Sequence, residues 1–114
     1  MKTFALNADQ IRPLATGHGA CIATDRITVD GLPVRFMYRE EPDYEADSGW
    51  RFLSGTEDDG YMDDAGNHGV YDVNTIANYD DTIIPFLDAP TGSVFEKPVD
   101  AQSFAAVTDW ESDT

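Results

Sequence analysis

The sequence predicts an α+β fold: a small, mainly antiparallel sheet with a β-hairpin in its N-terminal half and several short helices, in a single domain over residues 1–114. Three observations predict it. Two alternating apolar and polar runs flank Asp30-Gly31, a third alternating run follows, and short capped helical patterns fill the C-terminal half. With 41% hydrophobic residues, the chain is also apolar enough to bury a core.

The first elements expected are a short helix and a hairpin. Asn7 can cap the helix, which Pro13 limits to one or two turns. A strand over 20–29 follows, and Asp30-Gly31 turns it into a partner over 33–39, because Asp-Gly between alternating runs is a strong hairpin signal. In the partner strand one face should carry Val34, Phe36 and Tyr38, and the other Arg35, Met37 and Arg39.

The middle of the chain combines acidic loops with an aromatic strand. Residues 40–48 contain Pro42 and five acids, which is typical of a solvated loop. The strand expected over 49–54 places Trp50 and Phe52 on one face, opposite Arg51 and Leu53. Residues 55–69, rich in acids and glycine, are expected to be a loop or irregular structure.

The C-terminal half predicts three further elements and a tail. A helix over 72–79 can be capped by Asp72, and a second short helix over 83–88 follows the capping residues 80–82. A strand over 93–97 should lie at an edge of the sheet because proline follows it. The last segment, 100–110, fits a helix, before a polar end over 111–114. The side chains expected to dock this helix are Phe104, Val107 and Trp110.

Charge divides the chain into two unequal parts. Residues 1–39 have a net charge of +2, whereas residues 40–114 have a net charge of −17, from nineteen acids and only Arg51 and Lys97. Such a chain repels nucleic acid and anionic membrane surfaces. It would instead attract a basic protein, although solubility alone is the simpler explanation of an acidic surface.

The sequence gives weaker indications of the cellular compartment and of reactive residues. No apolar run approaches the ~18 residues of a membrane span, and the one cysteine, Cys21, cannot form an internal disulfide, so the cytoplasm is expected. Cys21 lies on an alternating strand, which favours a small buried hydrophobe over a nucleophile. No serine stands in a nucleophile elbow, so the sequence predicts no enzyme and no cofactor.

Three weak ligand sites remain as alternatives. The acids of residues 57–64 lack the spacing of a calcium loop, and His18 with Cys21 is at most half of a zinc site, so a solvated loop and turn histidines are favoured. Arg35, Arg39 and Arg51 could converge on a small anion, but pairing with Glu40, Glu41 or Asp47 is favoured.

Five segments, in order, resemble the bacterial immunity-protein-33-like family, also described as domain of unknown function 2185. They are Cys21-Ile-Ala-Thr-Asp-Arg-Ile27, the run Val34 to Pro42, Asp47-Ser-Gly-Trp-Arg-Phe-Leu-Ser-Gly55, Tyr71-Asp-Val-Asn-Thr-Ile-Ala-Asn-Tyr-Asp80, and Ile83-Ile-Pro-Phe-Leu-Asp88 leading to Gly92-Ser-Val-Phe-Glu96. The resemblance covers most of residues 20–97 and leaves 98–114 as a C-terminal helix and tail. It implies a small α+β domain that protects a bacterium from a toxin, without catalytic residues.

The resemblance and the charge together predict a non-enzymatic module that neutralises a cognate toxin by occlusion through an acidic surface. If the toxin is a nuclease, carboxylates of residues 40–64 could stand in for phosphates. Trp50 and Tyr61 are candidate anchors, although a tryptophan beside glycine on a strand is also typical of a core. The acids expected to contact the partner are Asp47, Glu57, Asp58, Asp59, Asp63 and Asp64. The alternatives are a small-ligand- or metal-binding protein and a homo-oligomer formed through the edge at 93–97.

Overall fold

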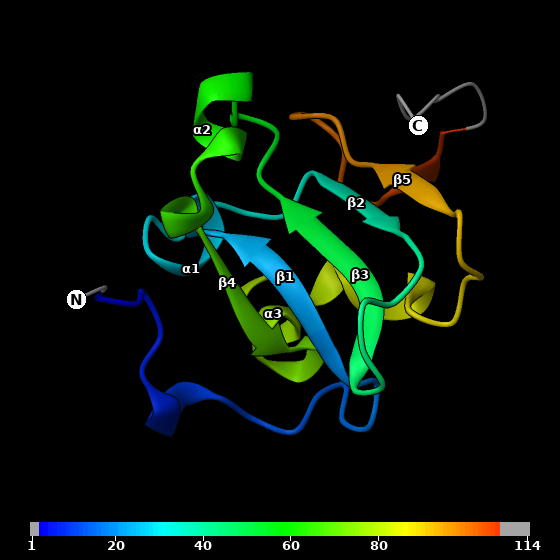
Figure 1. Ribbon diagram of the computed structural model, residues 1–114, viewed down its shortest axis with the longest axis horizontal. Helices are drawn as coiled ribbons and strands as arrows, with labels where there is room; N and C mark the ends of the chain where they lie inside the picture. The colour runs from blue at the N-terminus through cyan, green and yellow to red at the C-terminus, as the bar shows by residue number, and fades with distance from the viewer. Residues whose placement is uncertain (1–2, 108–114) are drawn as a thin grey trace.

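The computed structural model describes residues 3–107 and shows a six-stranded sheet with short helices around it (Figure 1). In chain order the elements, with η for a 3-10 helix, are η1 (Ala8–Gln10), β1 (Ala20–Thr24), α1 (Asp25–Thr28), β2 (Phe36–Arg39), β3 (Asp47–Leu53), α2 (Asp59–Asp63), η2 (Ala65–Asn67), β4 (His68–Asp72), α3 (Val73–Tyr79), η3 (Asp81–Phe86), β5 (Val94–Glu96) and β6 (Ala105–Ala106). The predicted α+β class with several short helices is confirmed.

The sheet is mixed but mostly antiparallel. Its strand order is β4-β1-β3-β2-β5-β6, and within residues 3–107 only β1 and β3 run parallel. Because β1 and β3 are parallel, the chain crosses over between them through α1 and β2. Strands β3 and β2 lie at the centre of this order, and β4 forms one of its edges.

The hairpin predicted across Asp30-Gly31 is wrong. Strand β1 ends at Thr24, and α1 occupies the second half of the expected strand 20–29. Gly31, with a φ of +75°, donates its N–H to Ile27 O at 3.0 Å and so ends this helix. A glycine with positive φ serves a helix end as well as a hairpin turn. The hairpin of the N-terminal half is instead β2–β3, joined by residues 40–46.

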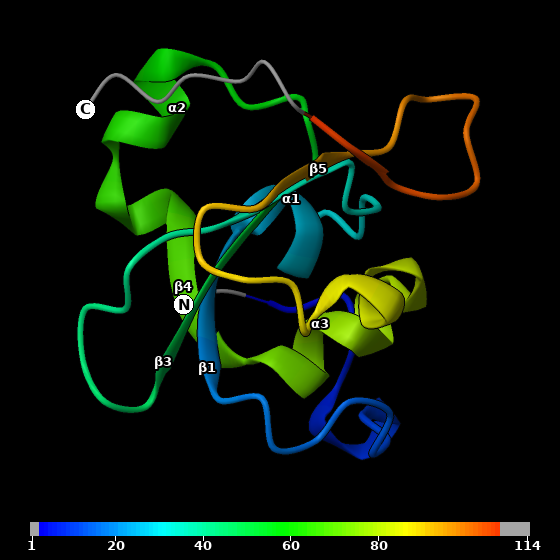
Figure 2. The same cartoon turned by 90° about the vertical axis from the view of Figure 1, so that its right-hand side faces the viewer.

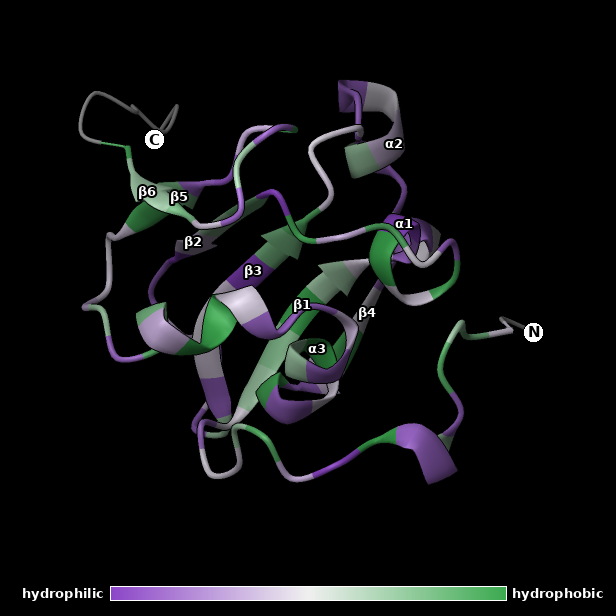
Figure 3. Cartoon of the chain, turned by 180° about the vertical axis from the view of Figure 1, so that it is seen from behind, coloured by the Kyte–Doolittle hydropathy of each residue, from purple (hydrophilic) through white to green (hydrophobic). Residues whose placement is uncertain are grey.

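One face of the sheet carries the core, beneath α3 and η3 (Figures 2 and 3). Trp50 and Phe52 are fully buried there, as the alternation in their strand predicts, with ring centroids 6.1 Å apart. The Trp50 indole donates Nε1–H to Leu87 O at 3.1 Å. Met37 joins this face, so β2 turns the opposite residues, Phe36 and Tyr38, away from the core.

The predicted helices at 72–79 and 83–88 are confirmed with small shifts. Asp72 caps α3 by accepting the N–H of Asn74 at 2.8 Å, and Asp80 caps η3 by accepting that of Thr82 at 3.0 Å. η3 is a 3-10 helix that begins earlier than expected. By contrast, residues 55–69 are not the loop expected, since they form α2, η2 and the start of β4.

The C-terminal part departs from the prediction. β5 confirms the strand at 93–97, but β6 pairs with it, through Phe95 with Ala106 and Glu96 with Ala105, so β5 is not an edge. The alternative of a homo-oligomer formed through an unpaired edge at 93–97 therefore lacks that edge. The predicted helix over 100–110 is absent from 100–107, where backbone bonding to β5 extends the sheet. Trp110 and residues 111–114 lie outside the described residues.

Candidate functional site

The sheet face opposite α3 and η3 is here called the open face. Strand alternation places on it Ile22 of β1, Tyr38 of β2, Arg51 and Leu53 of β3, and Val70 of β4. Register supports this, because Ile22 lies opposite both Arg51 and Val70, and Tyr38 lies opposite Arg51. Val70 is 60% exposed, and a pocket of about 200 Å³ lies over Ile22 and Tyr38.

Two acidic stretches project on this side of the sheet (Figure 2). The first is the acidic loop, residues 40–46, whose four carboxylates Glu40, Glu41, Asp43 and Glu45 are all exposed. Tyr44 in this loop is 49% exposed. Pro42 and the four acids favour a solvated loop, and every residue of the loop is exposed, as predicted.

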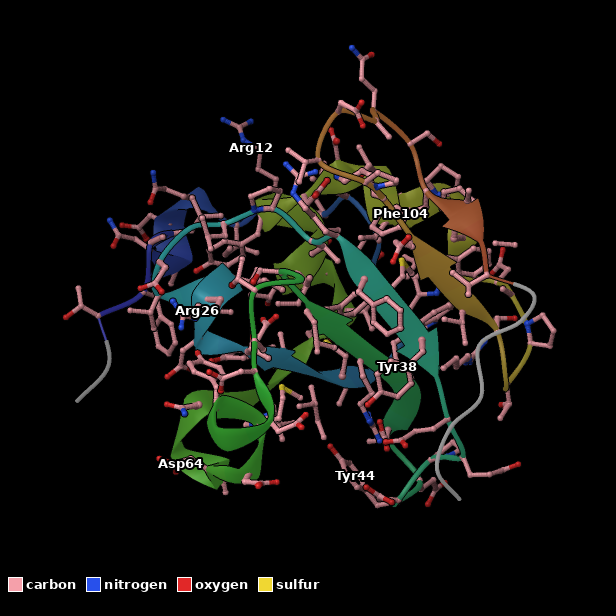
Figure 4. All side chains as sticks on the ribbon, turned by 90° about the horizontal axis from the view of Figure 1, so that it is seen from above. Arg12, Arg26, Tyr38, Tyr44, Asp64 and Phe104 are labelled. Atoms are coloured by element: carbon pink, nitrogen blue, oxygen red, sulfur yellow. The ribbon has the colours of Figure 1, made fainter. Side chains whose placement is uncertain are left out.

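The second stretch is the acidic segment, residues 57–64, which includes α2. Asp58 caps α2 by accepting the N–H of Tyr61 at 2.7 Å, and Asp64 accepts that of Gly66 at 2.9 Å. Asp59 and Asp63 lie on α2, exposed, and neither forms an ion pair with any described residue. Figure 4 places Asp64 and Tyr44 on the same side of the molecule. The two stretches therefore flank the open face.

Asp47 belongs to the framework of β3. Its carboxylate holds the Arg51 guanidinium in a bidentate pair, Oδ1 to Nη1 at 2.9 Å and Oδ2 to Nη2 at 2.8 Å, and it also accepts the N–H of Asp43 and of Gly49, each at 2.9 Å. Glu40 adds a second carboxylate, whose Oε2 lies 2.6 Å from Arg51 Nε. Both Asp47 and Arg51 are buried. The predicted pairing of Arg51 with Glu40 and Asp47 is confirmed.

The electrostatics of this cluster follow from its hydrogen bonds. Those from Arg51 hold the pKa of Asp47 far below its usual range, despite burial, and those to Asp47 raise the pKa of Arg51. The pair is therefore ionised at any physiological pH. Gly49 has a φ of +87°, and a Cβ there would collide with the carbonyl oxygen of Glu40, which explains the glycine in Asp-Ser-Gly-Trp-Arg.

Glu57 is also held internally. Its carboxylate accepts the Thr24 hydroxyl, the N–H of Ser54 at 2.9 Å and the N–H of Gly55 at 2.9 Å. Burial raises its pKa, but these hydrogen bonds outweigh burial, so the pKa of Glu57 is lowered. Glu57 thus fastens the start of the acidic segment to β1.

The two aromatic anchors expected from the sequence differ in exposure. Trp50 is fully buried in the core, which agrees with the alternative interpretation and removes it from the surface. Tyr61 is half-buried beneath the Arg26 guanidinium, whose Cζ lies 4.7 Å from the ring centroid. Burial and the charge of Asp25 raise the pKa of Tyr61. Neither ring is a freely exposed anchor.

The other sequence candidates do not form a site. Arg35 donates to Pro98 O at 3.1 Å, and Arg39 donates to Ala89 O at 2.7 Å on the core side, so these arginines do not converge with Arg51. Cys21 is buried, and burial raises its pKa, as expected of a small core residue. Among residues 3–107, no three histidine, cysteine or carboxylate side chains come close enough together to hold a metal ion.

The comparisons with known proteins add one match. A family model described as the Immunity protein Imm33 domain matches residues 21–108. The chain belongs to this family. Membership makes it an immunity protein, a class that neutralises toxins and is typically non-enzymatic. No curated protein and no solved structure matches it. In the described part of the chain, every helix is too short or too polar to cross a membrane.

Sequence reasoning missed some of the surface that flanks the open face. Glu41, Asp43 and Glu45 were included only within the range 40–64 whose carboxylates could stand in for phosphates, and neither they nor Tyr44 were named as contacts. Val70 was missed because residues 55–69 were expected to be a loop, which hid the alternation of β4. Of the acids expected to contact the partner, Asp47 is buried and Glu57 is half-buried, and each is held by internal hydrogen bonds.

Proposed function

We propose that this protein neutralises a cognate, basic toxin by binding it on the open face between the acidic loop and the acidic segment, and so occluding the toxin. The family match over residues 21–108 carries the neutralising role. Two stretches of carboxylates on one side of a rigid sheet support the electrostatic part of the proposal.

Charge favours a basic partner. The acidic segment contains no lysine or arginine. Arg26, whose guanidinium covers Tyr61, has its Nη1 4.0 Å from Asp30 Oδ2. Exposed carboxylates that lack a counter-charge raise the association rate with a basic protein, and salt weakens this effect. If the toxin is a nuclease, the same carboxylates would occupy its phosphate-binding surface.

Tyr44, Tyr38 and Val70 supply the apolar contacts of the proposed interface. Tyr44 is half-exposed within the acidic loop, and Val70 presents an exposed apolar side chain at the edge of the open face. Interfaces depend on a few such side chains surrounded by a charged rim. These residues replace Trp50, whose burial in the core makes it unsuitable as an anchor.

Growth rescue provides the first test. Toxin genes adjacent to this gene in its native genome are expressed with and without it, and survival only in its presence identifies the partner. The purified pair then gives association rates as a function of salt. We expect Asp59→Asn combined with Asp63→Asn to slow association roughly tenfold at low salt, with little difference at high salt.

Asp81→Asn combined with Asp88→Asn is the matched control. It changes the net charge equally, at exposed carboxylates on and after η3 on the opposite face of the sheet. We expect a much smaller change in its association rate. Equal slowing by both pairs would mean that only net charge matters and would refute docking at the open face.

A further inference from the structure

Strand β4 is the last strand of the sheet, and within residues 3–107 no other strand lies along its outer edge. Val73 donates its N–H to Gly19 O at 2.9 Å, and this pair continues the antiparallel register in which Tyr71 lies opposite Cys21 and Val70 opposite Ile22. Hydrogen-bonded and non-hydrogen-bonded pairs alternate along an antiparallel ladder, so Val70 falls in a non-hydrogen-bonded pair. Its N–H and C=O therefore point away from β1, off the edge of the sheet.

The bonding of β1 supports this assignment. Ala20, like Ile22, is in a non-hydrogen-bonded pair of the β1–β4 ladder. It donates its N–H to Ala46 O at 2.8 Å, toward β3 and away from β4. The strand order ends at β4, and no described residue pairs with its outer edge. An exposed edge of this kind is a template for one more strand.

The two sides of this edge differ in chemistry. On the core side, the Tyr71 ring lies so close to Gly69 that a Cβ there would collide with it, and Phe4 meets Tyr71 edge-on with ring centroids 5.8 Å apart. On the open-face side, a hollow of about 320 Å³ is lined by Ile22, Met62, Asp63, Ala65 and His68. An added strand would face aromatic rings with one set of side chains and Asp63 with the other.

Charge selects the occupant of this edge. Asp63 and Asp64 precede β4 and Asp72 ends it, and all three carboxylates are exposed. A second copy of this chain would bring the same carboxylates together, so like charges oppose a symmetric β4–β4 pair. A strand with lysine or arginine on alternate positions would place its charges beside Asp63 instead.

We propose that β4 is a strand-addition site for an extended segment of the toxin in which basic and apolar residues alternate. This inference rests on the proposed function for the identity of the partner. The residue of the added strand that lies opposite Val70 shares two backbone hydrogen bonds with it. The basic side chains of the added strand lie on the open-face side and reach toward Asp63, and its apolar side chains pack against Tyr71 and Phe4. Backbone pairing then supplies affinity, and the alternation supplies specificity.

The test uses two peptides of equal composition and charge, acetyl-(Lys-Val)₃-amide and acetyl-Lys₃-Val₃-amide, titrated into the whole protein labelled with ¹⁵N. We expect the alternating peptide to bind more tightly, to shift the Val70 amide and to slow its hydrogen exchange. Equal binding of both peptides, or no binding by either, refutes strand addition. Chemical-shift changes confined to the amides of residues 57–64 would also refute strand addition.

Val70→Pro removes the outward N–H and leaves the β1–β4 hydrogen bonds intact, whereas the control Val70→Thr keeps the N–H and the β-branched shape. We expect Val70→Pro to weaken binding of the alternating peptide about tenfold, and Val70→Thr to leave it nearly unchanged. Protected ladder amides confirm that the variant folds. If it does not fold, Val70→Lys supplies the test, because its charge should repel the peptide.

Equal binding by Val70→Pro and Val70→Thr would overturn strand addition. It would leave the proposed function intact, since that depends on Asp59 and Asp63 and is measured with the toxin itself. The converse outcome is that Asp59→Asn combined with Asp63→Asn leaves toxin association unchanged while Val70→Pro still weakens peptide binding. That result would refute docking through the acidic segment but would support strand addition at β4.

Discussion

Residues 40–47 and residues 57–64 each contain five carboxylates, yet the structure uses them differently. In the first stretch, Arg51 gathers Glu40, Asp43 and Asp47, within 2.6–3.6 Å, and buries one of them. In the second, Glu57 is held by hydroxyl and backbone donors, and Asp59 and Asp63 remain exposed without a described ion pair.

The comparison shows that acidic composition does not define a binding surface. A single buried guanidinium turns neighbouring carboxylates into a framework, because a buried charge requires partners that satisfy its donors. Where no such base is present, carboxylates stay in water and act at a distance. Substitutions of framework acids should therefore change stability, whereas substitutions of surface acids should leave it nearly unchanged.

Asp47→Ala should be strongly destabilising. It leaves the buried Arg51 without its bidentate partner and also removes the acceptor for the N–H groups of Asp43 and Gly49. We expect the free energy of unfolding, measured by urea titration, to fall by about 3–5 kcal/mol. Asp63→Ala is the control, with an expected change within about 0.5 kcal/mol. Similar losses from both would erase the distinction between framework and surface.

The same pair should appear in the pH dependence of stability. Because the folded-state pKa of Asp47 is depressed, its contribution is present above the unfolded pKa of about 3.9 and is lost as pH falls through the folded value. We expect the free energy of unfolding to decline between about pH 5 and 2 in the wild type, and less steeply in Asp47→Ala. In Asp47→Ala the free energy of unfolding should still fall with decreasing pH, because the pKa values of Glu57 and Asp80 are also lowered. Parallel pH profiles would contradict the role given to Asp47.

Much of the fold was visible in the sequence because local signals and tertiary structure agree there. The alternation around Trp50 and Phe52 matches a strand with one buried face, and Asp72 and Asp80 cap helices where capping residues were expected. Asp30-Gly31 misled because glycine at positive φ fits two structures, and the pairing of β1 with β3, distant in sequence, decided between them.

The site was less predictable than the fold. Acid density identified the right segments, but exposure depends on contacts that no local pattern contains. Asp47 is buried because Arg51 lies four residues along the same strand face, and Trp50 is buried because Leu87 and Phe52 surround it. Val70 became visible only once β4 was recognised as a strand at the sheet edge.

Thr24→Val tests the internal role of Glu57. It keeps the shape of the side chain and removes the hydroxyl donated to the carboxylate, which retains its bonds from Ser54 and Gly55. We expect a loss of about 1.5 kcal/mol in the free energy of unfolding, typical of a hydrogen bond to a charged group. The exposed Thr16→Val should change stability by less than about 0.5 kcal/mol. A neutral Thr24→Val would mean that Glu57 belongs with the surface acids.

Asp59→Asn combined with Asp63→Asn should have the smallest effect on stability. Both side chains are exposed on α2, without a described ion pair, so we expect a change within about 0.5 kcal/mol in urea titration. The sign, if resolved, should be stabilising at low salt, because the chain carries a net charge of −15 and each lost carboxylate relieves repulsion. A loss of 2 kcal/mol or more, on the order of a buried hydrogen-bonded group, would mean that α2 is part of the framework. The variant is therefore informative about toxin binding only because its fold should be unchanged.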